Sequence, residues 1–362
     1  MRDRLDRRAF LRRGVVGAGG VALLGPSLLA ACGDDDDTST SGGGGGGSNA
    51  DFGTLDYQLS WIKNVEFAGQ YIADQEGYYT DAGFSRVNLI AGGPNVTQDA
   101  VVASGRAFVG ISAPDITGSA IVEGAPLVAV AALFQKNPFC VMSLADSPIT
   151  SVEDLQGKSI GVQSVNEPVW NAFLAANDID PDSIDKVPAQ FDPQPLANGE
   201  VDGWFSFVTN EPNLLLVQGI ETETLLLADF NYPLVSQIYV VRRDTLENER
   251  DKIKAFLMAD IRGWHDSLAD PGRGAELAVN EYGADLGLEV EEQTLESESQ
   301  NELILSDDTR ANGIMTMTDE LVAENIDTLG IAGIDITAEQ LFDLSVVEEI
   351  YEENPDLKEL PV

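Results

Sequence analysis

The chain has 362 residues, roughly twice the length of an ordinary domain, so two domains or one bilobal unit is expected. Lys and Arg total 21 against 61 Asp and Glu, a formal net charge of −40. That excess argues against a nucleic-acid partner, because phosphate binding needs concentrated Lys and Arg. Two cysteines and one histidine nearly exclude disulfide scaffolds, cysteine-rich zinc sites and histidine-based triads, so no metal or cofactor is expected.

The N-terminus has the features of an export signal. Six arginines within residues 1–13 precede an apolar stretch over 14–31, which contains Pro26 and several glycines and is a poor permanent membrane span. The run Arg7-Arg8-Ala9-Phe10-Leu11-Arg12 is similar to a twin-arginine motif. Leu29-Ala30-Ala31-Cys32 resembles the bacterial lipobox, in which cleavage exposes a cysteine that becomes lipidated. We predict a twin-arginine lipoprotein signal peptide over 1–31 and a lipid anchor on Cys32. The alternative is a chance cysteine after an ordinary secretory signal.

Residues 32–50 are expected to form a flexible tether. They contain four consecutive aspartates (34–37), a Ser/Thr stretch and six consecutive glycines (42–47), a composition that cannot bury apolar surface. The aspartates lack the alternating spacing of a calcium-binding loop. The segment therefore predicts a solvated spacer between the anchor and a globular part.

The globular part alternates short apolar runs with amphipathic stretches, which is typical of an α/β architecture. The expected strands are 55–61, 87–91, 108–111, 127–134, 140–144, 159–162, 203–207 and 237–242. Helices are expected near 67–79, 97–104, 116–123, 168–177 and 212–218. Beyond residue 246 the pattern becomes helical, with expected helices over 249–268, 274–282, 292–305, 318–329 and 338–352.

Motifs for catalysis are scarce. His265 stands alone inside an expected helix, and Cys140 lies in an apolar run and is interpreted as a small buried hydrophobic residue. Gly157-Lys158-Ser159 imitates the end of a phosphate loop, but Val152 occupies the position of the first glycine. Carboxylates are too abundant to single out a catalytic pair. An enzyme is therefore not expected.

The stretch over 55–84 resembles the opening of bacterial periplasmic substrate-binding proteins of the thiamine-pyrimidine-precursor, sulfonate and nitrate group. In that group the first strand leads into a loop and helix of the form W-x-x-N-x-x-H-x-G-x-Y-x-A-x-x-x-G-Y-Y. The matching residues here are Trp61, Asn64, Gly69, Tyr71, Ala73, Gly77, Tyr78 and Tyr79. Phe67 stands where the pyrimidine-precursor members have His.

Further motifs of the same family follow in chain order over about residues 55–245. They are the loop 92–95, the run 103–111 with Phe108 in place of an acid, the hinge-proximal 134–138, the second-lobe start 149–162 and the turn 199–203. The resemblance implies a bilobal periplasmic-binding-protein fold, with two mixed-sheet α/β lobes, a hinge and a helical C-terminal region. The expected limits are 51–145 for the first part of lobe 1, 146–235 for lobe 2, and 236–362 for the return to lobe 1 and the C-terminal helices.

The same resemblance implies a solute-binding lipoprotein of an ABC importer, which captures a small molecule between its lobes and delivers it to a membrane permease. Loops after the expected strands are rich in aromatic, amide and acidic residues, which favours a planar heterocycle over an anion. The expected ligand is similar to a thiamine pyrimidine precursor, with flavin as a larger relative. The candidate ligand-binding residues are Trp61, Asn64, Glu66, Phe67, Asn95, Asp115, Gln135, Asn137, Asn166, Trp170, Trp204, Asn210 and Glu211.

Two alternatives remain open at this point. A binding protein for sulfonate, taurine or nitrate would need cationic or backbone N–H donors, and basic residues are few among these loops. The remoter alternative is an enzyme similar to a fungal pyrimidine synthase of the same fold, whose active-site histidine and cysteine-rich motif this sequence lacks.

Overall fold

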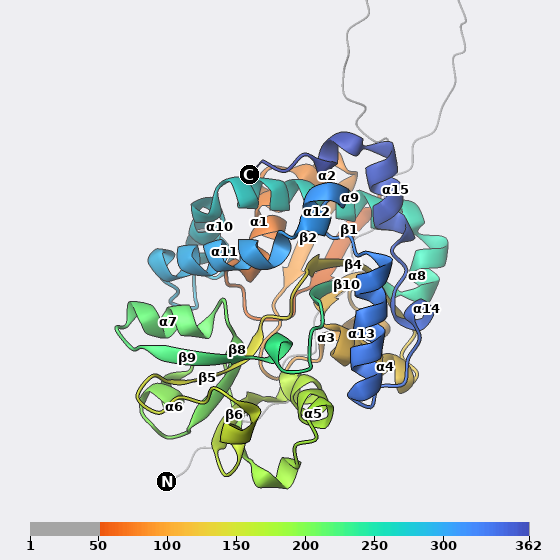
Figure 1. Cartoon of the computed structure of the whole chain (residues 1–362). Helices are drawn as coiled ribbons and strands as arrows, with labels where there is room; N and C mark the ends of the chain where they lie inside the picture. The colour runs from red at the N-terminus through yellow and green to blue at the C-terminus, as the bar shows by residue number, and fades with distance from the viewer. Residues whose placement is uncertain (1–50, 362) are drawn as a thin grey trace, which may run out of the picture. The chain divides into compact units, whose positions relative to one another are not determined.

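The computed structural model describes residues 51–361, which belong to one compact unit. The predicted signal peptide over 1–31, the lipidation site Cys32 and the tether lie outside the described residues. Two five-stranded mixed sheets with flanking helices form two lobes, which confirms the expected bilobal α/β architecture (Figure 1). No helix among the described residues is long and apolar enough to cross a bilayer.

The lobe 1 sheet has the strand order β2-β1-β3-β10-β4. Its strands are β1 (Gly53–Gln58), β2 (Phe84–Ile90), β3 (Val109–Ser112), β4 (Leu127–Phe134) and β10 (Ser236–Arg242). Strand β1 is parallel to β2 and β3, whereas β10 is antiparallel to β3 and β4. Every residue of β4 is buried, as its unbroken apolar run requires.

The lobe 2 sheet has the order β7-β6-β8-β5-β9. Its strands are β5 (Phe139–Leu144), β6 (Ser159–Gln163), β7 (Asp185–Ala189), β8 (Gly203–Phe207) and β9 (Thr222–Leu226). Strand β6 is parallel to β7 and β8, and β5 is antiparallel to β8 and β9. Strands β7 and β9 were not predicted, because both are half-exposed edge strands without an apolar run.

The chain crosses between the lobes twice, after β4 and before β10. The first crossing lies at residues 135–138, so β5 belongs to the lobe 2 sheet and the change of lobe comes before the limit expected after residue 145. The second crossing lies between Leu226 and Ser236. An ion pair of 3.2 Å between Lys136 and Asp229 connects the two crossing segments.

The helices of residues 65–217 alternate with the strands. They are η1 (Val65–Phe67), α1 (Ala68–Gln75), α2 (Tyr78–Asp81), α3 (Gln98–Ala103), α4 (Pro114–Val122), η2 (Val152–Leu155), η3 (Ser164–Asn166), α5 (Glu167–Ala176), η4 (Pro181–Ser183), α6 (Gln194–Ala197) and α7 (Glu211–Val217). The single helix expected over 67–79 is divided into α1 and α2 at Gly77. That residue adopts a φ of 77°, a left-handed conformation that favours glycine.

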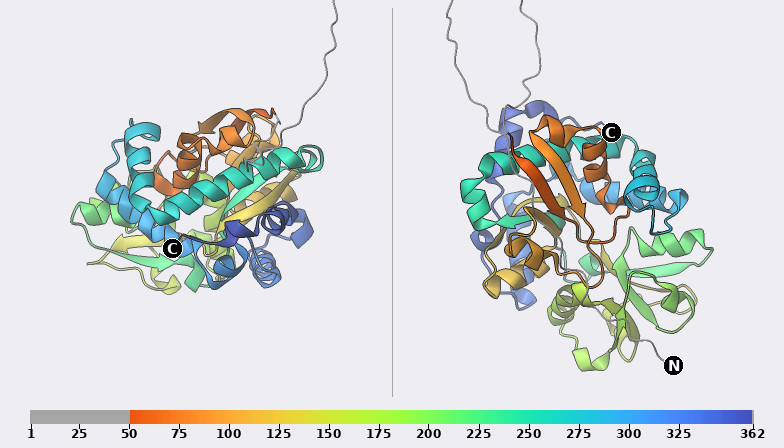
Figure 2. Two further views of the ribbon diagram at one scale, coloured as in Figure 1. Left: turned by 90° about the horizontal axis from the view of Figure 1, so that it is seen from above. Right: turned by 180° about the vertical axis from the view of Figure 1, so that it is seen from behind.

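The C-terminal part is helical, as predicted, and packs mainly on lobe 1 (Figure 2). The short helix η5 (Leu227–Asp229) precedes β10. The helices after β10 are α8 (Arg243–Asn248), α9 (Arg250–Ala269), α10 (Pro271–Leu277), η6 (Ala278–Tyr282), α11 (Val290–Ile304), α12 (Asp307–Asn312), α13 (Asp319–Ile331), α14 (Ala338–Leu341), α15 (Ser345–Glu353) and η7 (Pro355–Lys358). The helix expected over 338–352 is two helices, and α12 was not predicted. Helix α11 also contacts α7 of lobe 2.

Helix α1 is fixed against α9 by a buried polar network around Asp260. The carboxylate accepts hydrogen bonds from Tyr57 Oη at 2.7 Å and Gln70 Nε2 at 3.1 Å, and also from Tyr79 Oη. Burial raises the pKa of Asp260 to about 7. The network joins β1, α1, α2 and α9, so it holds the start of α1 and the preceding η1 in one position.

Candidate functional site

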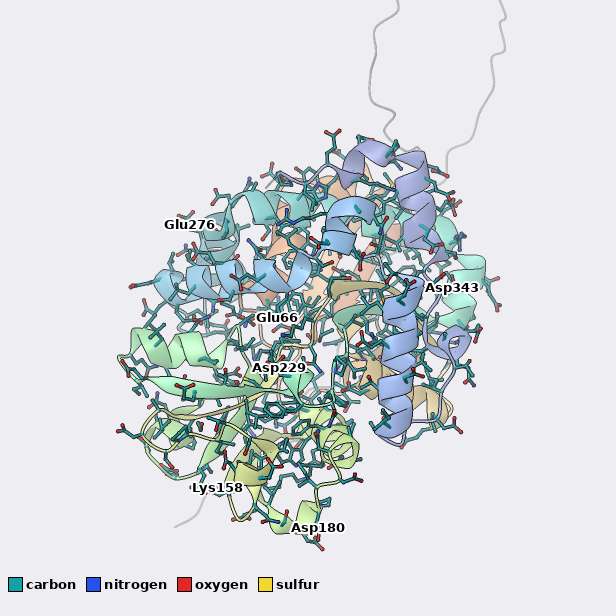
Figure 3. The ribbon with its side chains drawn as sticks, in the orientation of Figure 1. Glu66, Lys158, Asp180, Asp229, Glu276 and Asp343 are labelled. Carbon is teal, nitrogen blue, oxygen red and sulfur yellow. The ribbon has the colours of Figure 1, made fainter. Side chains whose placement is uncertain are left out.

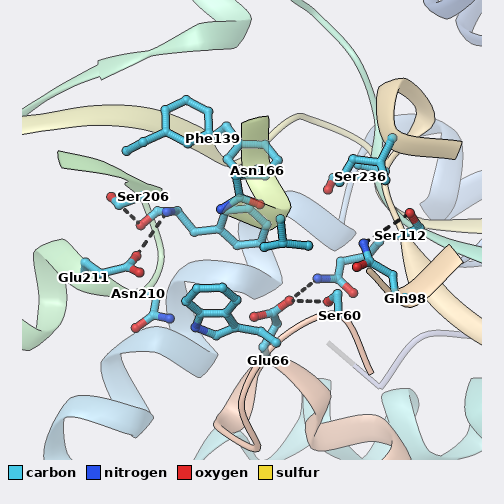
Figure 4. Close-up of a pocket in the computed structure, with 17 residues that line it drawn as sticks. Ser60, Glu66, Gln98, Ser112, Phe139, Asn166, Ser206, Asn210, Glu211 and Ser236 are labelled. Atoms are coloured by element: carbon cyan, nitrogen blue, oxygen red, sulfur yellow. Dashed lines mark hydrogen bonds between the residues drawn. The ribbon is translucent and has the colours of Figure 1, made fainter. Parts of the chain in front are cut away.

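A pocket lies where the strand ends of the two lobes face each other (Figure 4). In lobe 1 the chain enters the pocket directly after β1, at Ser60 and Trp61, and directly after β3, at Ala113. The antiparallel β10 begins there, at Ser236. Carboxyl ends of parallel strands share one sheet edge, and ligands of open α/β sheets bind at that edge.

Lobe 2 supplies the opposite wall. Val165 and Asn166 follow β6, while Asn210 and Glu211 follow β8. Phe139 begins β5, which runs antiparallel to β8 and therefore starts at the same edge. The pocket is thus built from residues far apart in the chain, brought together by the topology of two separate sheets.

Aromatic rings form much of the apolar lining. Phe139 stacks on Phe205 with ring centroids 5.0 Å apart and meets Phe207 edge-on at 4.6 Å. Trp61 comes from lobe 1 and keeps only 8% of its surface exposed. Such rings provide flat apolar faces for a planar ligand.

Contacts across the pocket rim hold the two lobes together. The backbone N–H of Val165 donates to Pro94 O at 3.1 Å, and Asn95 Nδ2 donates to Gln190 Oε1 at 3.3 Å. On the other side Asn213 Nδ2 of α7 donates to Ser299 Oγ of α11 at 3.3 Å. The lobes therefore lie against each other around the site, which limits access of water to the ligand-facing groups.

Glu66 is the acidic group on the lobe 1 side, at the centre of the molecule in the view of Figure 3. Its Oε1 accepts a hydrogen bond from Ser60 Oγ at 3.1 Å and another from Gln237 Nε2. Burial raises the pKa of the Glu66 carboxyl to about 7. Gln237 holds a φ of 52°, a strained conformation for a non-glycine residue and one that concentrates at functional sites.

Glu211 is the acidic group on the lobe 2 side, in the first turn of α7. Its Oε2 accepts the backbone N–H of Phe207 at 3.1 Å, which fixes the carboxyl at the end of β8. Burial raises the pKa of Glu211 to about 8, and the negative charges of Glu66 and Glu292 add to the increase. None of the pocket-lining residues in the described chain is Lys, Arg or His.

Two further buried acids on α11, Glu292 and Glu296, lie close enough to Glu66 and Glu211 to interact electrostatically with them. We call these four residues the glutamate cluster. Gln293 Nε2 donates to Glu292 Oε2 at 2.7 Å and to Glu296 Oε2 at 2.9 Å. Burial raises the pKa of Glu292 to about 7 and that of Glu296 well above its ordinary value. No ion pair of residues 51–361 includes a member of the cluster.

Raising the pH from about 5 to about 8 is expected to lower the free energy of unfolding. A carboxyl whose folded pKa is raised keeps a proton that the unfolded chain releases near pH 4.5, so stability is lost as the pH rises toward the folded pKa. With Glu66 at about 7 and Glu211 at about 8, most of the loss falls in this window. We expect it to exceed about 2 kcal/mol, measured by urea unfolding across the range.

The variant Glu292→Gln should make this fall with pH smaller, because it removes one buried charge from the cluster at pH 8. Glu298→Gln is the matched control, since Glu298 lies on the same helix with its side chain exposed. If the two variants lose stability with pH to the same extent, the cluster is not the source of the effect.

Two helix N-termini lie at the pocket. Ala113 precedes α4 and Asn166 precedes α5, and both residues line the pocket. Pro114 and Pro168, in the first turns of these helices, have no N–H group. The N–H of Ile116 donates to Asp115 Oδ1 at 2.8 Å, and the N–H of Glu167 donates to Ser164 O. The helix ends therefore add little to the hydrogen-bond donors of the pocket.

Five of the ligand-binding residues predicted from the sequence line this pocket, namely Trp61, Glu66, Asn166, Asn210 and Glu211. Asn64 lies behind the wall, where its Nδ2 donates to Glu296 Oε1 at 2.8 Å. Phe67 is buried in the lobe 1 core, although it occupies the position of the family histidine. Asn95 is in the rim contact described above.

The other five predicted residues also lie outside the pocket lining. Asp115 accepts from Tyr232 Oη at 2.6 Å and so fixes the second crossing segment. Gln135 and Asn137 stabilise the first crossing segment, where Gln135 Nε2 donates to Ala132 O and Asn137 Oδ1 accepts from Phe139 N.

Both remaining predicted tryptophans are core residues. Trp170 packs edge-on against the pocket aromatic Phe205, with ring centroids 5.5 Å apart, so it supports the wall from behind. Trp204 covers Gly161 of the neighbouring strand, where an added Cβ would lie 2.5 Å from the indole ring. The sequence predicts both tryptophans in loops that follow strands, but Trp170 lies within α5 and Trp204 near the beginning of β8, on faces turned to the core.

The prediction missed several polar lining residues, including Ser60, Gln98, Ser112, Ser206, Ser236 and Gln237. All of these except Gln98, which begins α3, lie at or near a strand end, which is the signal that could have indicated them. The described residues contain no group of three or more His, Cys, Asp or Glu arranged to hold a metal ion. Cys140 is buried beside Ser206, and burial raises the pKa of its thiol to about 12.

The comparisons with known proteins agree on one family. Residues 64–274 match the family model described as NMT1/THI5 like. The chain is 29% identical over 234 residues to the riboflavin-binding protein RibY of Chloroflexus aurantiacus, covering 61% of this chain and 64% of RibY. It is 24% identical over 251 residues to the formylaminopyrimidine-binding protein of Halalkalibacterium halodurans, covering 67% of this chain and 76% of that protein.

Among solved structures, the periplasmic nitrate-binding protein NrtA from Synechocystis PCC 6803 superimposes with a TM-score of 0.61 at 15% identity. The superposition covers 86% of this chain and 92% of NrtA. At this identity the likeness concerns the fold, which is the bilobal fold of periplasmic binding proteins. The alignment with RibY spans less than two thirds of that protein's length.

Proposed function

The chain belongs to the NMT1/THI5-like family, and from that premise we propose that it is the solute-binding protein of an ABC importer for a small planar heterocycle. The ligand is a pyrimidine similar to a thiamine precursor, or a flavin. It is held between the two lobes and passed to a membrane permease. The protein acts by binding and release, without a chemical step.

The proposed ligand class rests on one observation: the pocket combines aromatic walls with a carboxyl group on each side. Trp61 and Phe139 provide apolar ring faces, and the carboxyls of Glu66 and Glu211 face the pocket from opposite lobes. A heterocycle bearing amino or imide N–H groups satisfies both features, because its faces stack and its edges donate. Since the acceptors come from both lobes, such a ligand favours the closed arrangement over the open one.

The relatives support the same ligand class. RibY is named for riboflavin and the Halalkalibacterium halodurans protein for formylaminopyrimidine, and both names describe planar nitrogen heterocycles. The proposal that the protein is not an enzyme rests on these binding-protein relatives and on a pocket lining without His, Cys or Lys in the described residues.

An anion such as sulfonate or nitrate is the second candidate, favoured by the fold shared with NrtA. Helix N-termini lie at the pocket at Ala113 and Asn166, but Pro114 and Pro168 reduce the number of N–H groups that they offer to an anion. Against it, two buried carboxyls face the same space and no basic side chain lines it in the described chain. A bound anion is repelled by either carboxyl when it ionises, whereas a donor-rich ligand stabilises the ionised form.

We further propose that the protein is held on the outer side of the bacterial cell membrane by a lipid on Cys32, after export through the twin-arginine route. Residues 33–50 then separate the anchor from the lobes. The substitution Cys32→Ser should move the protein from the membrane fraction to the soluble fraction of cells. Equal distribution of wild type and variant would contradict the anchor and leave the ligand proposal unaffected.

The ligand class is tested by thermal unfolding of the full chain with riboflavin, formylaminopyrimidine, taurine, an alkylsulfonate and nitrate. A ligand at 100 times its dissociation constant stabilises the folded state by about 2.7 kcal/mol, which raises the melting temperature by several degrees. We expect a shift with a heterocycle and none with the anions. A shift with the anions alone would replace the heterocycle by an anionic ligand and keep the transport role.

A further inference from the structure

Gln98, at the start of α3, carries an unpaired acceptor at the ligand pocket. The side chain lines the pocket and only 2% of its surface is exposed. Its Nε2 donates to Ser112 Oγ at 3.4 Å, while its Oε1 has no hydrogen-bond partner among the described residues. A buried amide oxygen without a donor is costly, so its presence at a binding site points to a donor on the ligand.

The orientation of this amide is set by Asp99, which does not line the pocket. Ser112 Oγ donates to Asp99 Oδ2 at 3.3 Å, and Thr117 Oγ1 donates to the same oxygen at 3.0 Å. A hydroxyl has one proton, and Ser112 uses it on Asp99. Ser112 can therefore only accept from Gln98, which turns the amide nitrogen toward Ser112 and leaves Oε1 as the free end (Figure 4).

We propose that Gln98 is a specificity-determining residue that accepts a hydrogen bond from an N–H group of the ligand, and that Asp99 is the positioning residue that orients it through Ser112. The inference rests on the proposed function and narrows it. The ligand donates a hydrogen bond to Gln98 on the lobe 1 side, in addition to any that it donates to the pocket carboxyls. Its class is a heterocycle with an N–H group on the edge that faces Gln98, and an analogue alkylated at that nitrogen is discriminated against.

The test compares each parent compound with an analogue in which one N–H is replaced by N–CH₃, using isothermal titration of the full chain. The pairs are riboflavin with its ring-imide N-methyl derivative and formylaminopyrimidine with its N-methylamino derivative. We expect at least one parent to bind about tenfold or more tightly than its analogue. The variant Gln98→Met keeps the length of the side chain but lacks the acceptor. In this variant the ratio of the dissociation constant of the analogue to that of the parent compound should fall toward one.

The variant Asp99→Asn separates positioning from contact. Its new amide can donate to Ser112 Oγ, which frees the Ser112 proton for Gln98 Oε1 and turns the Gln98 amide around. The preference for the N–H compound should then be lost or reversed. Asp56→Asn is the matched control, because it also removes a lobe 1 carboxyl that accepts a side-chain hydrogen bond, from Asn88 Nδ2 at 2.6 Å, but touches neither the pocket lining nor the Gln98 hydrogen bonds, so the ratio should remain that of wild type.

Each outcome has a distinct meaning. A ratio unchanged in both Gln98→Met and Asp99→Asn would overturn this inference alone, since discrimination would then come from steric exclusion of the methyl group. Equal binding of parent and analogue by the wild-type protein would overturn it as well. If neither parent compound binds the wild-type protein, the proposed heterocycle function fails and this inference fails with it.

Discussion

Replacing Trp61 by alanine should weaken binding of the heterocyclic ligand about 30-fold, a loss of roughly 2 kcal/mol of binding free energy. Trp61 is the tryptophan that lines the pocket, while Trp170, Trp204 and Trp264 are each at most 2% exposed in the cores of the lobes. Truncation removes a stacking face from the lobe 1 wall and leaves water beside the ligand. Isothermal titration measures the affinity, and Trp61→Phe should fall between wild type and Trp61→Ala.

Phe191→Ala provides the control for this prediction. Phe191 is an aromatic residue of lobe 2 that is 43% exposed and does not line the pocket, so its removal should leave affinity unchanged. If riboflavin is the ligand, its fluorescence should be quenched on binding to wild type by the stacked indole and less by Trp61→Phe. Wild-type affinity in Trp61→Ala would mean that the ligand does not lie against this residue.

The substitution Gly263→Ala should lower the free energy of unfolding by about 3 kcal/mol. Gly263 lies on α9 where that helix crosses α1, and an added Cβ would overlap the backbone oxygen of Gly69 and lie 2.9 Å from the Ala73 Cβ. Because the obstacle is backbone, the helices must separate. Helix α1 directly follows η1, which carries Glu66, so ligand affinity should fall together with stability.

Gly330→Ala is the matched control for Gly263→Ala. Gly330 also lies in a helix, α13, but nothing is within 4 Å of the position of an added Cβ. Alanine in place of an exposed helical glycine stabilises a helix by up to about 1 kcal/mol. Chemical denaturation should therefore move the two variants in opposite directions. Similar stability of both would show that α1 and α9 do not pack as closely as described.

The order of elements could be predicted from the sequence because their apolar periodicity is strong. The buried runs that became β4 and β8 were predicted at or near their observed limits. What the periodicity could not indicate was the pairing of β10 between β3 and β4, or of β5 between β8 and β9, because these partners are distant in the chain. The edge strands β7 and β9 were missed for lack of an apolar run.

The candidate site was predictable only in part. Family motifs and strand ends indicated Trp61, Glu66 and Glu211, and the structure places all three in one pocket. The serines and glutamines of the wall were missed, because a small polar residue at a strand end does not by itself indicate whether its side chain faces the pocket. The approach of α11 to Glu66 and Glu211 brings together residues more than 80 positions apart. Such proximity follows from packing of the C-terminal helices and has no local signature.

The most direct test of the account is a crystal structure of the full chain with the compound that stabilises it most. We expect a planar heterocycle between Trp61 and the ring cluster of Phe139, with an N–H group donating to Gln98. Density for such a ligand in this pocket would establish both the site and the ligand class. A ligand bound elsewhere, or a sulfonate or nitrate held at the N-termini of α4 and α5, would contradict the account.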